Sequence, residues 1–325
     1  MPNSIVKVTT SLPAIRKQAK DFAEAAIQPN TKRAYKAAWE DFKTYCADRK
    51  IKPMPASAGD VADYITFCAN GDLKTQTIAV RLAAISKAHR LNKQTDPTID
   101  EAVKLVMKGI RRTVGTRQKQ KAAITDDILS QIVGTFTDDI VGARNKAITL
   151  IGWAGAFRRG EVVSFDVEDL AFKPWGVMML LKESKTDQEK EGVSQPVPYL
   201  EDKSICPVMA LKDWLAVSGI ATGPIFRRID RWGKVGKHRL TSQVANTIVK
   251  NAVAAIGLDD DQAGFHGLRA GIITTCIRMG MSLAEIQPVS RHKKFDTLIK
   301  YQRSEGVVAM NSVLKAFSKI GKSNQ

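Results

Sequence analysis

A chain of 325 residues is long for one domain and sufficient for two. Its 50 lysines and arginines outweigh 33 aspartates and glutamates, and the resulting net charge of +17 attracts polyanions such as nucleic acid, although a soluble protein that is simply basic is the alternative. We expect a cytoplasmic protein, because no apolar run reaches the roughly 20 residues of a membrane span and no export signal opens the chain. The four cysteines are scattered without metal-ligand spacing, which predicts free thiols and no metal site.

The first third of the chain predicts a helical domain, residues 1–114. Over residues 31–50, apolar side chains recur at steps of three and four residues, the spacing of one helix face. These side chains are Tyr35, Ala38, Trp39, Phe42, Tyr45 and Cys46. Further helices are predicted over residues 58–69, 75–90 and 100–112.

A basic segment follows this helical domain. Residues 108–121, KGIRRTVGTRQKQK, hold six basic residues and no acidic one, and Gly115 interrupts the run. We interpret residues 115–124 as an interdomain linker. A solvated charge run is the ordinary explanation, but a position between two domains favours contact with DNA. The candidate contact residues here are Arg111, Arg112, Arg117, Lys119 and Lys121.

The second domain, residues 125–325, is predicted to be helical with a small antiparallel sheet. Two helices over residues 125–134 and 140–157 precede three strands rich in Val, Leu and Met. The strands are predicted at residues 163–172, 177–181 and 193–199. Helices then return at residues 207–218, 241–256, 267–279, 282–289 and 296–303, and residues 307–320 form a final amphipathic stretch. The fold class is mainly α with a mixed α/β second domain.

Four residues near the C-terminus combine phosphate-binding groups with a nucleophile. His266 and Arg269 lie three residues apart and share one face of a predicted helix. His292 follows after a turn, and Tyr301 lies nine residues beyond it. Each has an ordinary explanation when taken singly, and Tyr301 in particular suits a helical core.

Upstream residues add to this set. In AGAFRRGEVVSF, Arg158 and Arg159 lie at the end of a predicted apolar helix, where an arginine is costly unless it is paired or binds an anion. Glu161 is interpreted as a structural partner that holds an arginine in place. Lys185 lies at the tip between two predicted strands, where a long side chain reaches over a ligand. His89 and His238 are interpreted as ordinary surface or helix residues.

In order and spacing, these motifs resemble the tyrosine recombinase (phage integrase) family. The matching residues are Arg158, Lys185, His266, Arg269, His292 and Tyr301. The resemblance covers most of residues 125–305, and the N-terminal helices are similar to the core-binding domain of that family. It implies the two-domain type without an arm-binding domain.

This resemblance implies a site-specific recombinase that cleaves and rejoins DNA through a 3′-phosphotyrosine on Tyr301. Arg158, Arg269 and His292 would hold the phosphate oxygens as charge develops on them. His266 would assist proton transfer from Tyr301, and Lys185 would protonate the departing 5′-oxygen. Because the covalent link conserves the phosphodiester energy, no cofactor is implied, neither metal nor ATP.

Three assignments stay open within the resemblance. Arg159 stands beside Arg158, which we favour because of its spacing to Glu161. Lys182 and Lys190 flank Lys185 and are alternative acids. The family often has Gly immediately before the histidine that matches His292, whereas this chain has Arg291.

The resemblance also implies an assembly. Two domains would clamp double-stranded DNA, with Lys237 and Arg239 as further contacts, and recombination between four half-sites implies a homotetramer on DNA. Residues 307–320 would either dock on a neighbouring subunit or pack on their own domain. The alternative functions are a type IB topoisomerase-like or resolvase activity, an inactive DNA-binding regulator, and an unrelated scaffold for acidic proteins.

Overall fold

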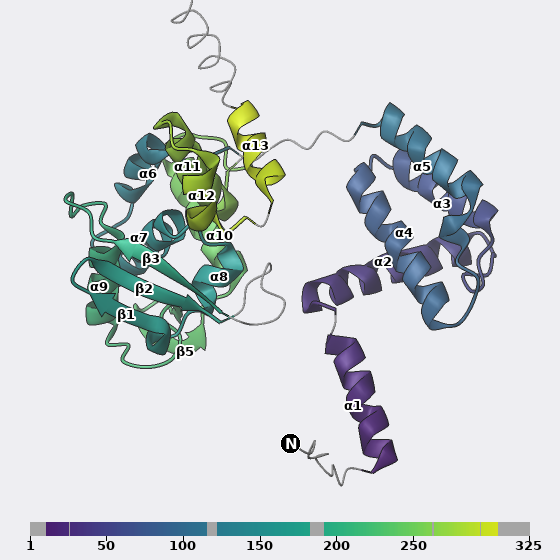
Figure 1. Cartoon of the computed structure of the whole chain (residues 1–325), viewed down its shortest axis with the longest axis horizontal. Coiled ribbons are helices and arrows are strands. Elements are labelled where there is room, and N and C mark those ends of the chain that lie inside the picture. Colours follow the sequence, from purple (N-terminus) through teal and green to yellow (C-terminus); the bar gives the residue numbers. More distant parts are fainter. Residues whose placement is uncertain are drawn as a thin grey trace, which may run out of the picture. The chain divides into compact units, whose positions relative to one another are not determined.

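The computed structural model describes residues 11–25, 27–115, 122–182, 192–261, 263–292 and 294–304. The chain divides into two compact units, Met1–Gln118 and Lys119–Gln325 (Figure 1). Each unit has a core of its own, so we describe them separately. No described helix is long and apolar enough to cross a membrane.

Unit 1 is entirely helical in its described part. Its elements are α1 (Leu12–Ala25), α2 (Pro29–Asp48), α3 (Ala58–Asn70), α4 (Thr75–Leu91), a 3-10 turn η1 (Pro97–Ile99) and α5 (Glu101–Thr113). The stripe predicted on α2 is confirmed, because Phe42 and Cys46 are fully buried and Phe42 packs edge-on against Tyr64 of α3. A capping box between Ser57 and Asp60 begins α3. The sequence did not predict α1.

His89 lies within helix α4, one of the two places expected of it. It is fully buried rather than at the surface. Its Nε2 accepts a hydrogen bond from the backbone N–H of Ala56 at 2.9 Å, and its Nδ1 lies 2.9 Å from the carbonyl oxygen of Ile85. Since an N–H donates to Nε2, the neutral ring carries its proton on Nδ1 and donates to Ile85. His89 therefore links α4 to the segment before α3.

Unit 2 is mainly helical with two small sheets. Its helices are α6 (Asp126–Val133), α7 (Ile140–Ala154), α8 (Arg159–Ser164), the 3-10 turn η2 (Val167–Asp169), α9 (Pro207–Ser218), α10 (Ser242–Ala255), α11 (Phe265–Arg278), α12 (Leu283–Ser290) and α13 (Phe295–Ser304). An antiparallel sheet has the order β1 (Leu170–Lys173), β2 (Gly176–Leu181) and β3 (Val193–Pro198), and β4 (Arg227–Ile229) pairs with β5 (Val235–Arg239). The predicted fold class is confirmed.

The first predicted strand was wrong over residues 163–169. Residues 159–164 form α8 and residues 167–169 form η2, so β1 begins at Leu170. The run of Val and Phe reflects burial, since Val162, Val163 and Phe165 belong to the core of unit 2. Short apolar runs suit a buried helix as well as a strand, and here tertiary packing decides.

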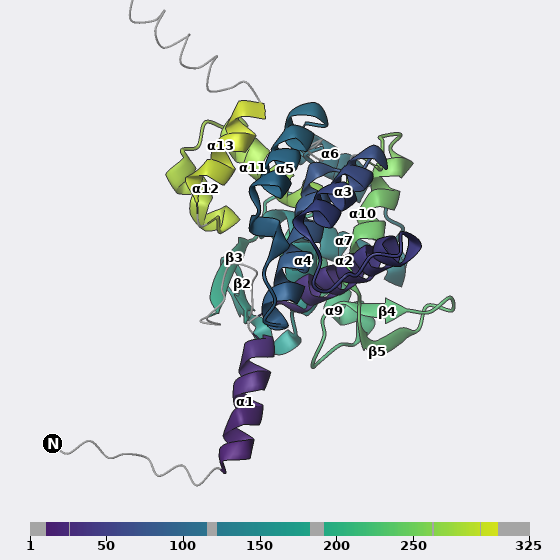
Figure 2. The same cartoon turned by 90° about the vertical axis from the view of Figure 1, so that its right-hand side faces the viewer.

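The central helices of unit 2 position the histidine, arginine and tyrosine motifs of the C-terminal region. The buried α11 packs on α7, and α12 and α13 pack beside it. Two views at right angles place α12 and α13 at the opposite end of unit 2 from β4 and β5 (Figures 1 and 2). Tyr301 of α13 packs on a small cluster that includes Ile273, Ile277 and Leu298.

Candidate active site

Arg158 lies where the chain passes from α7 into α8. The prediction placed it at the end of a helix over residues 140–157, but α7 ends at Ala154 and Arg158 is the N-cap of α8. Its backbone N–H donates to Glu161 Oε2 at 3.0 Å, and its Nη1 donates to Oε1 at 2.6 Å. The short helix and the carboxylate therefore fix both ends of this arginine.

Glu161 is the buried acid of the cluster. Although burial raises its pKa, the backbone hydrogen bond from Arg158 and the positive charge of Arg291 hold that pKa below its ordinary value. Its carboxylate bonds to both Arg158 and Arg291. Its interpretation as a structural partner of an arginine agrees with these contacts.

The neighbouring Arg159 points elsewhere. Its side chain is exposed and contacts Gln243 Oε1 at 3.4 Å. By contrast, the charge of Arg158 acts on the pKa values of Arg269, His292 and Tyr301. Arg158 is therefore the arginine that the fold brings to the other predicted residues.

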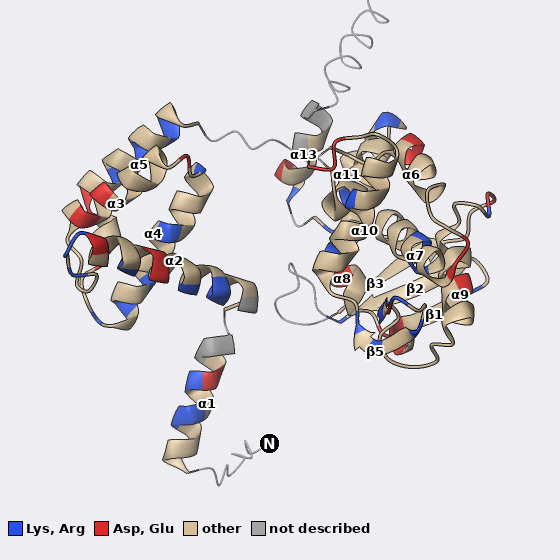
Figure 3. Cartoon of the chain, turned by 180° about the vertical axis from the view of Figure 1, so that it is seen from behind, with Lys and Arg blue, Asp and Glu red and all other residues tan. Residues whose placement is uncertain are grey.

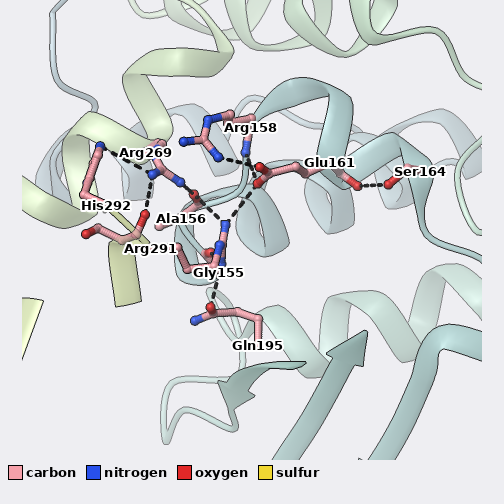
Figure 4. A network of polar contacts seen from close by, with 10 residues as sticks. Gly155, Ala156, Arg158, Glu161, Ser164, Gln195, Arg269, Arg291 and His292 are labelled. Carbon is pink, nitrogen blue, oxygen red and sulfur yellow. Dashed lines mark hydrogen bonds and ion pairs between the residues drawn. The ribbon is translucent and has the colours of Figure 1, made fainter. Parts of the chain in front are cut away.

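Arg269 lies in the first turns of α11 and is only 1% exposed. Its Nη1 donates to the carbonyl oxygen of Ala156 at 2.5 Å, and its Nη2 donates to that of Ser290 (Figure 4). Burial, reinforced by the charges of Arg158 and Arg291, lowers the pKa of Arg269 to about 9. The guanidinium is still charged at neutral pH, in a place where like charges repel it.

His292 follows α12 and lies beside Arg269. Its Nε2 is 3.4 Å from Arg269 Nη2. Because an arginine can only donate, Nε2 accepts and the neutral ring carries its proton on Nδ1. That Nδ1 is buried without a hydrogen-bond partner among the described residues. Burial and the nearby arginines lower the pKa of His292 to about 4, so the ring is a neutral donor at physiological pH.

Tyr301 lies on α13, with its ring centre 6.3 Å from that of His292. Burial raises the pKa of the phenol, against the opposing charges of Arg269 and Arg158. Tyr301 is therefore protonated at neutral pH and needs a base before it can attack. His266, exposed in the first turn of α11, lies close enough to contribute to the lowered pKa of His292.

The predicted general acid lies outside the described residues. Lys185 and the alternative Lys190 both fall between β2 and β3 in residues 183–191. The other alternative, Lys182, is described, and its Nζ lies 2.6 Å from Asp169 Oδ1 in an ion pair.

Sequence reasoning missed two residues of this network. Arg291 was noted only as a departure from the family pattern, and Gln195 of β3 was not noted. Arg291 Nη1 donates to Gln195 Oε1 at 2.6 Å and to the carbonyl oxygen of Gly155 at 2.9 Å (Figure 4). The one available signal was a long charged residue at a position that favours Gly.

The predicted DNA-contact residues lie on different elements. Arg111 and Arg112 are exposed in the last turn of α5, and Figure 3 shows positions of basic residues in blue along that helix. Lys237 is exposed on β5. Arg239 is committed internally, because its guanidinium donates to the carbonyl oxygens of Val163 and Phe165 and pairs with Asp166. Arg117, Lys119 and Lys121 lie outside the described residues.

The charges of the cluster do not balance. Within the described part of unit 2, three guanidiniums (Arg158, Arg269 and Arg291) share one carboxylate, Glu161. Uncompensated buried charge is unfavourable, so this arrangement favours binding of an anion. No group of three or more His, Cys, Asp or Glu side chains suited to a metal occurs among the described residues. An anion site beside a tyrosine, in a basic helical protein, is suited to an enzyme that acts on phosphodiesters.

Comparisons with known proteins identify the family within this class. The model of the phage integrase family matches residues 122–306. An integrase/recombinase XerD homologue of Selenomonas ruminantium is 34% identical over 306 residues, covering 93% of this chain and 89% of the relative. The Cre recombinase of Escherichia phage P1 is 25% identical over 280 residues, covering 80% of each.

A solved structure shows the same fold. The integrase of transposon Tn1549, in complex with transposon right-end DNA, superposes with a TM-score of 0.60 at 15% identity and covers 85% of this chain and 89% of that one. The chain belongs to the phage integrase family of tyrosine recombinases. It is a site-specific recombinase, an enzyme of DNA strand cleavage and strand transfer.

Proposed function

We propose that Arg158, Arg269 and His292 bind one DNA phosphate and that Tyr301 attacks it. The observation that carries this proposal is the unbalanced cluster of three guanidiniums around one carboxylate, beside the partly buried Tyr301. A phosphate of the DNA backbone supplies the missing negative charge. The guanidiniums and the Nδ1–H of His292 then stabilise the further charge that builds on the non-bridging oxygens.

The reaction needs two proton transfers. His266 takes the proton of Tyr301, whose raised pKa keeps it protonated at neutral pH. The phenolate oxygen forms a bond to phosphorus while the bond to the 5′-oxygen breaks, and Lys185 donates a proton to that leaving oxygen. The product is a 3′-phosphotyrosine, and attack by another 5′-hydroxyl reverses each step and rejoins DNA.

Binding of duplex DNA by both units completes the proposal. The exposed Arg111, Arg112 and Lys237 are suited to backbone phosphates, together with Arg117, Lys119 and Lys121. Because exchange between two duplexes uses four half-sites, the active assembly is a homotetramer on DNA, associated with the nucleoid. Residues 307–320, outside the described residues, are the candidate segment for docking between its subunits.

The test is capture of the covalent intermediate. Nicked duplexes from the DNA that flanks the gene are incubated with the wild type and with Tyr301→Phe, and complexes that survive boiling in detergent are separated on a gel. The wild type should give a covalent band and Tyr301→Phe none, while both bind DNA with equal affinity. A covalent band of equal strength from Tyr301→Phe would rule out Tyr301 as the nucleophile.

A further inference from the structure

Arg291 occupies a backbone conformation that favours glycine. It is the C-cap of α12, with φ 53° and ψ 36° in the left-handed region. A residue with a Cβ is strained there, whereas glycine adopts this conformation readily. A long side chain at such a position therefore needs compensating contacts, and Arg291 has them in a buried setting, with its side chain 8% exposed.

The Arg291 guanidinium contacts three segments of the chain, which are α8, β3 and the connection between α7 and α8. Its Nη2 lies 3.0 Å from Glu161 Oε2 of α8 and donates to the carbonyl oxygen of Ala156 at 3.2 Å. Its Nη1 bonds to Gln195 of β3, and the guanidinium carbon lies 4.8 Å from the ring centre of Phe157. Partners that lie far apart in sequence are thus held by one side chain, as Figure 4 shows.

Two of these partners are shared with the arginines assigned to the phosphate. Glu161 bonds to Arg291 through Oε2 and to Arg158 through Oε1. The carbonyl oxygen of Ala156 accepts from both Arg291 and Arg269. A substitution at Arg291 would therefore disturb Arg158 through the Glu161 carboxylate and Arg269 through the Ala156 carbonyl oxygen.

The third partner extends the network to the sheet. Gln195 is 4% exposed on β3 and pairs with Met179 of β2. The connection between these two strands carries Lys185. Arg291 thereby ties the strand pair that bears the proposed acid to the helix end that bears His292.

We propose that Arg291 is a positioning residue, which orients Arg158 and Arg269 toward the scissile phosphate and anchors β3 beside them. This proposal rests on the proposed function of the cluster. The guanidinium holds Arg158, Arg269 and β3 in place at the end of α12. A glycine at this position would adopt the left-handed backbone conformation but would make none of these contacts.

The test compares Arg291→Gly with Arg291→Ala. Both variants lose the guanidinium, but only glycine also relieves the strain of the left-handed backbone. Arg291→Gly should therefore unfold at a higher temperature than Arg291→Ala. The readouts are the rate of covalent-complex formation at saturating nicked DNA and the affinity for that DNA. Both variants should form the complex on the order of 10–100-fold more slowly, with affinity within about twofold of the wild type.

Arg144→Met is the matched control. Arg144 is also a buried arginine of unit 2, 7% exposed, but it bonds to Asn145 and to the carbonyl oxygen of Arg227. The Arg144→Met variant should lose thermal stability. It should keep the wild-type cleavage rate at a temperature where the protein is folded. Arg291→Gly that cleaves at the wild-type rate would overturn the positioning role. Absence of a covalent complex from the wild type would instead contradict the proposed function.

A neutral phosphate separates positioning from a general structural role. Once the covalent complex has located the scissile phosphate, a methylphosphonate replaces it, which removes the charge that the arginines meet. The defect of Arg291→Gly relative to the wild type should shrink severalfold on this substrate. An equal defect on both substrates would show that the variant does not act through Arg158 and Arg269.

Discussion

At the scale of single residues, the two arginines of the cluster, Arg158 and Arg269, lie in different environments. Arg158 is partly exposed and paired with Glu161, whereas Arg269 is buried and bonded to two carbonyl oxygens. Arg158 is accessible to a ligand, and Arg269 is held by its two carbonyl acceptors. The charges of both arginines act on the pKa values of His292 and Tyr301, whose ring centres lie 6.3 Å apart.

Arg158 and Arg159 can be distinguished by the effect of each on the rate of covalent-complex formation. Arg158→Met should lower the rate of covalent-complex formation by about 100–1000-fold, the usual cost of removing one donor from a charge-stabilising site. Arg159→Met should retain a rate close to wild type, because Arg159 contacts Gln243 outside the cluster. Gel quantification of the covalent band over time measures both, and the reverse order would transfer the role to Arg159.

The lowered pKa of His292 predicts a dependence of stability on pH. Between pH 6.5 and about 4 the unfolded state binds a proton at this histidine and the folded state does not. The free energy of unfolding therefore falls as pH falls through this window. In urea unfolding series, His292→Asn should lose less stability than the wild type between pH 6.5 and 4. Parallel curves for the two proteins would show that His292 titrates normally.

At the scale of elements, α11 depends on glycines. Ile124 lies directly on this helix, since its N–H donates to the carbonyl oxygen of Gly267. Its own carbonyl oxygen accepts a hydrogen bond from the indole N–H of Trp153 on α7. A Cβ on Gly271 would lie 1.7 Å from the Ile124 carbonyl oxygen. The helix that carries His266 and Arg269 is therefore held against the start of unit 2 by backbone contact.

Gly271→Ala should consequently destabilise unit 2 by about 1–3 kcal/mol, the usual cost of overpacking. Gly109→Ala is the matched control, because that glycine lies within α5 and has no atom within 4 Å of an added Cβ. It should stabilise unit 1 by about 0.5–1 kcal/mol through helix propensity. Thermal unfolding measures both, and a neutral Gly271→Ala would show that the close contact relaxes easily.

The sequence predicted several helices well and missed other elements. The helix at residues 207–218 coincides with α9, and the strong stripe on α2 is buried as expected. The β4–β5 hairpin was missed because its strands, RRI and VGKHR, show little apolar alternation. Helix α1 was missed too, because its apolar residues are sparse among charged and small ones.

The site shows a similar division. Arg269, His292 and Tyr301 were predicted to lie together from motif spacing within one stretch of sequence, and the structure places Arg269 on α11, His292 just after α12 and Tyr301 on α13. Arg291 was not among them, because its partners Gln195 and Gly155 lie 96 and 136 residues away and no local pattern links them. Long-range contacts of this kind require the fold.

At the scale of the whole molecule, charge is the dominant property. A net charge of +17 with exposed basic residues on both units predicts DNA affinity that is strongly dependent on salt. If the protein meets 6–10 phosphates, affinity should fall by about 10³–10⁵ between 50 and 200 mM salt. Fluorescence anisotropy of labelled duplex measures this slope.

Substitutions on α5 refine that expectation. Arg111→Ala and Arg112→Ala should each reduce the salt slope by about one unit, if each side chain neutralises one phosphate. Arg239→Ala should leave the slope unchanged and lower thermal stability, because its guanidinium bonds within unit 2. If neither Arg111→Ala nor Arg112→Ala changes the salt slope, unit 1 contacts DNA through another face.

The covalent bond proposed between Tyr301 and DNA can be tested by identifying the attached residue. Protease digestion of the purified covalent complex, followed by nuclease trimming and mass spectrometry, identifies the residue bonded to the nucleotide. We expect a peptide bearing a nucleotide phosphate on Tyr301, with the phosphate retained from the 3′ end of the cleaved strand. A nucleotide attached to any other residue, or linked through a 5′-phosphate, would contradict it.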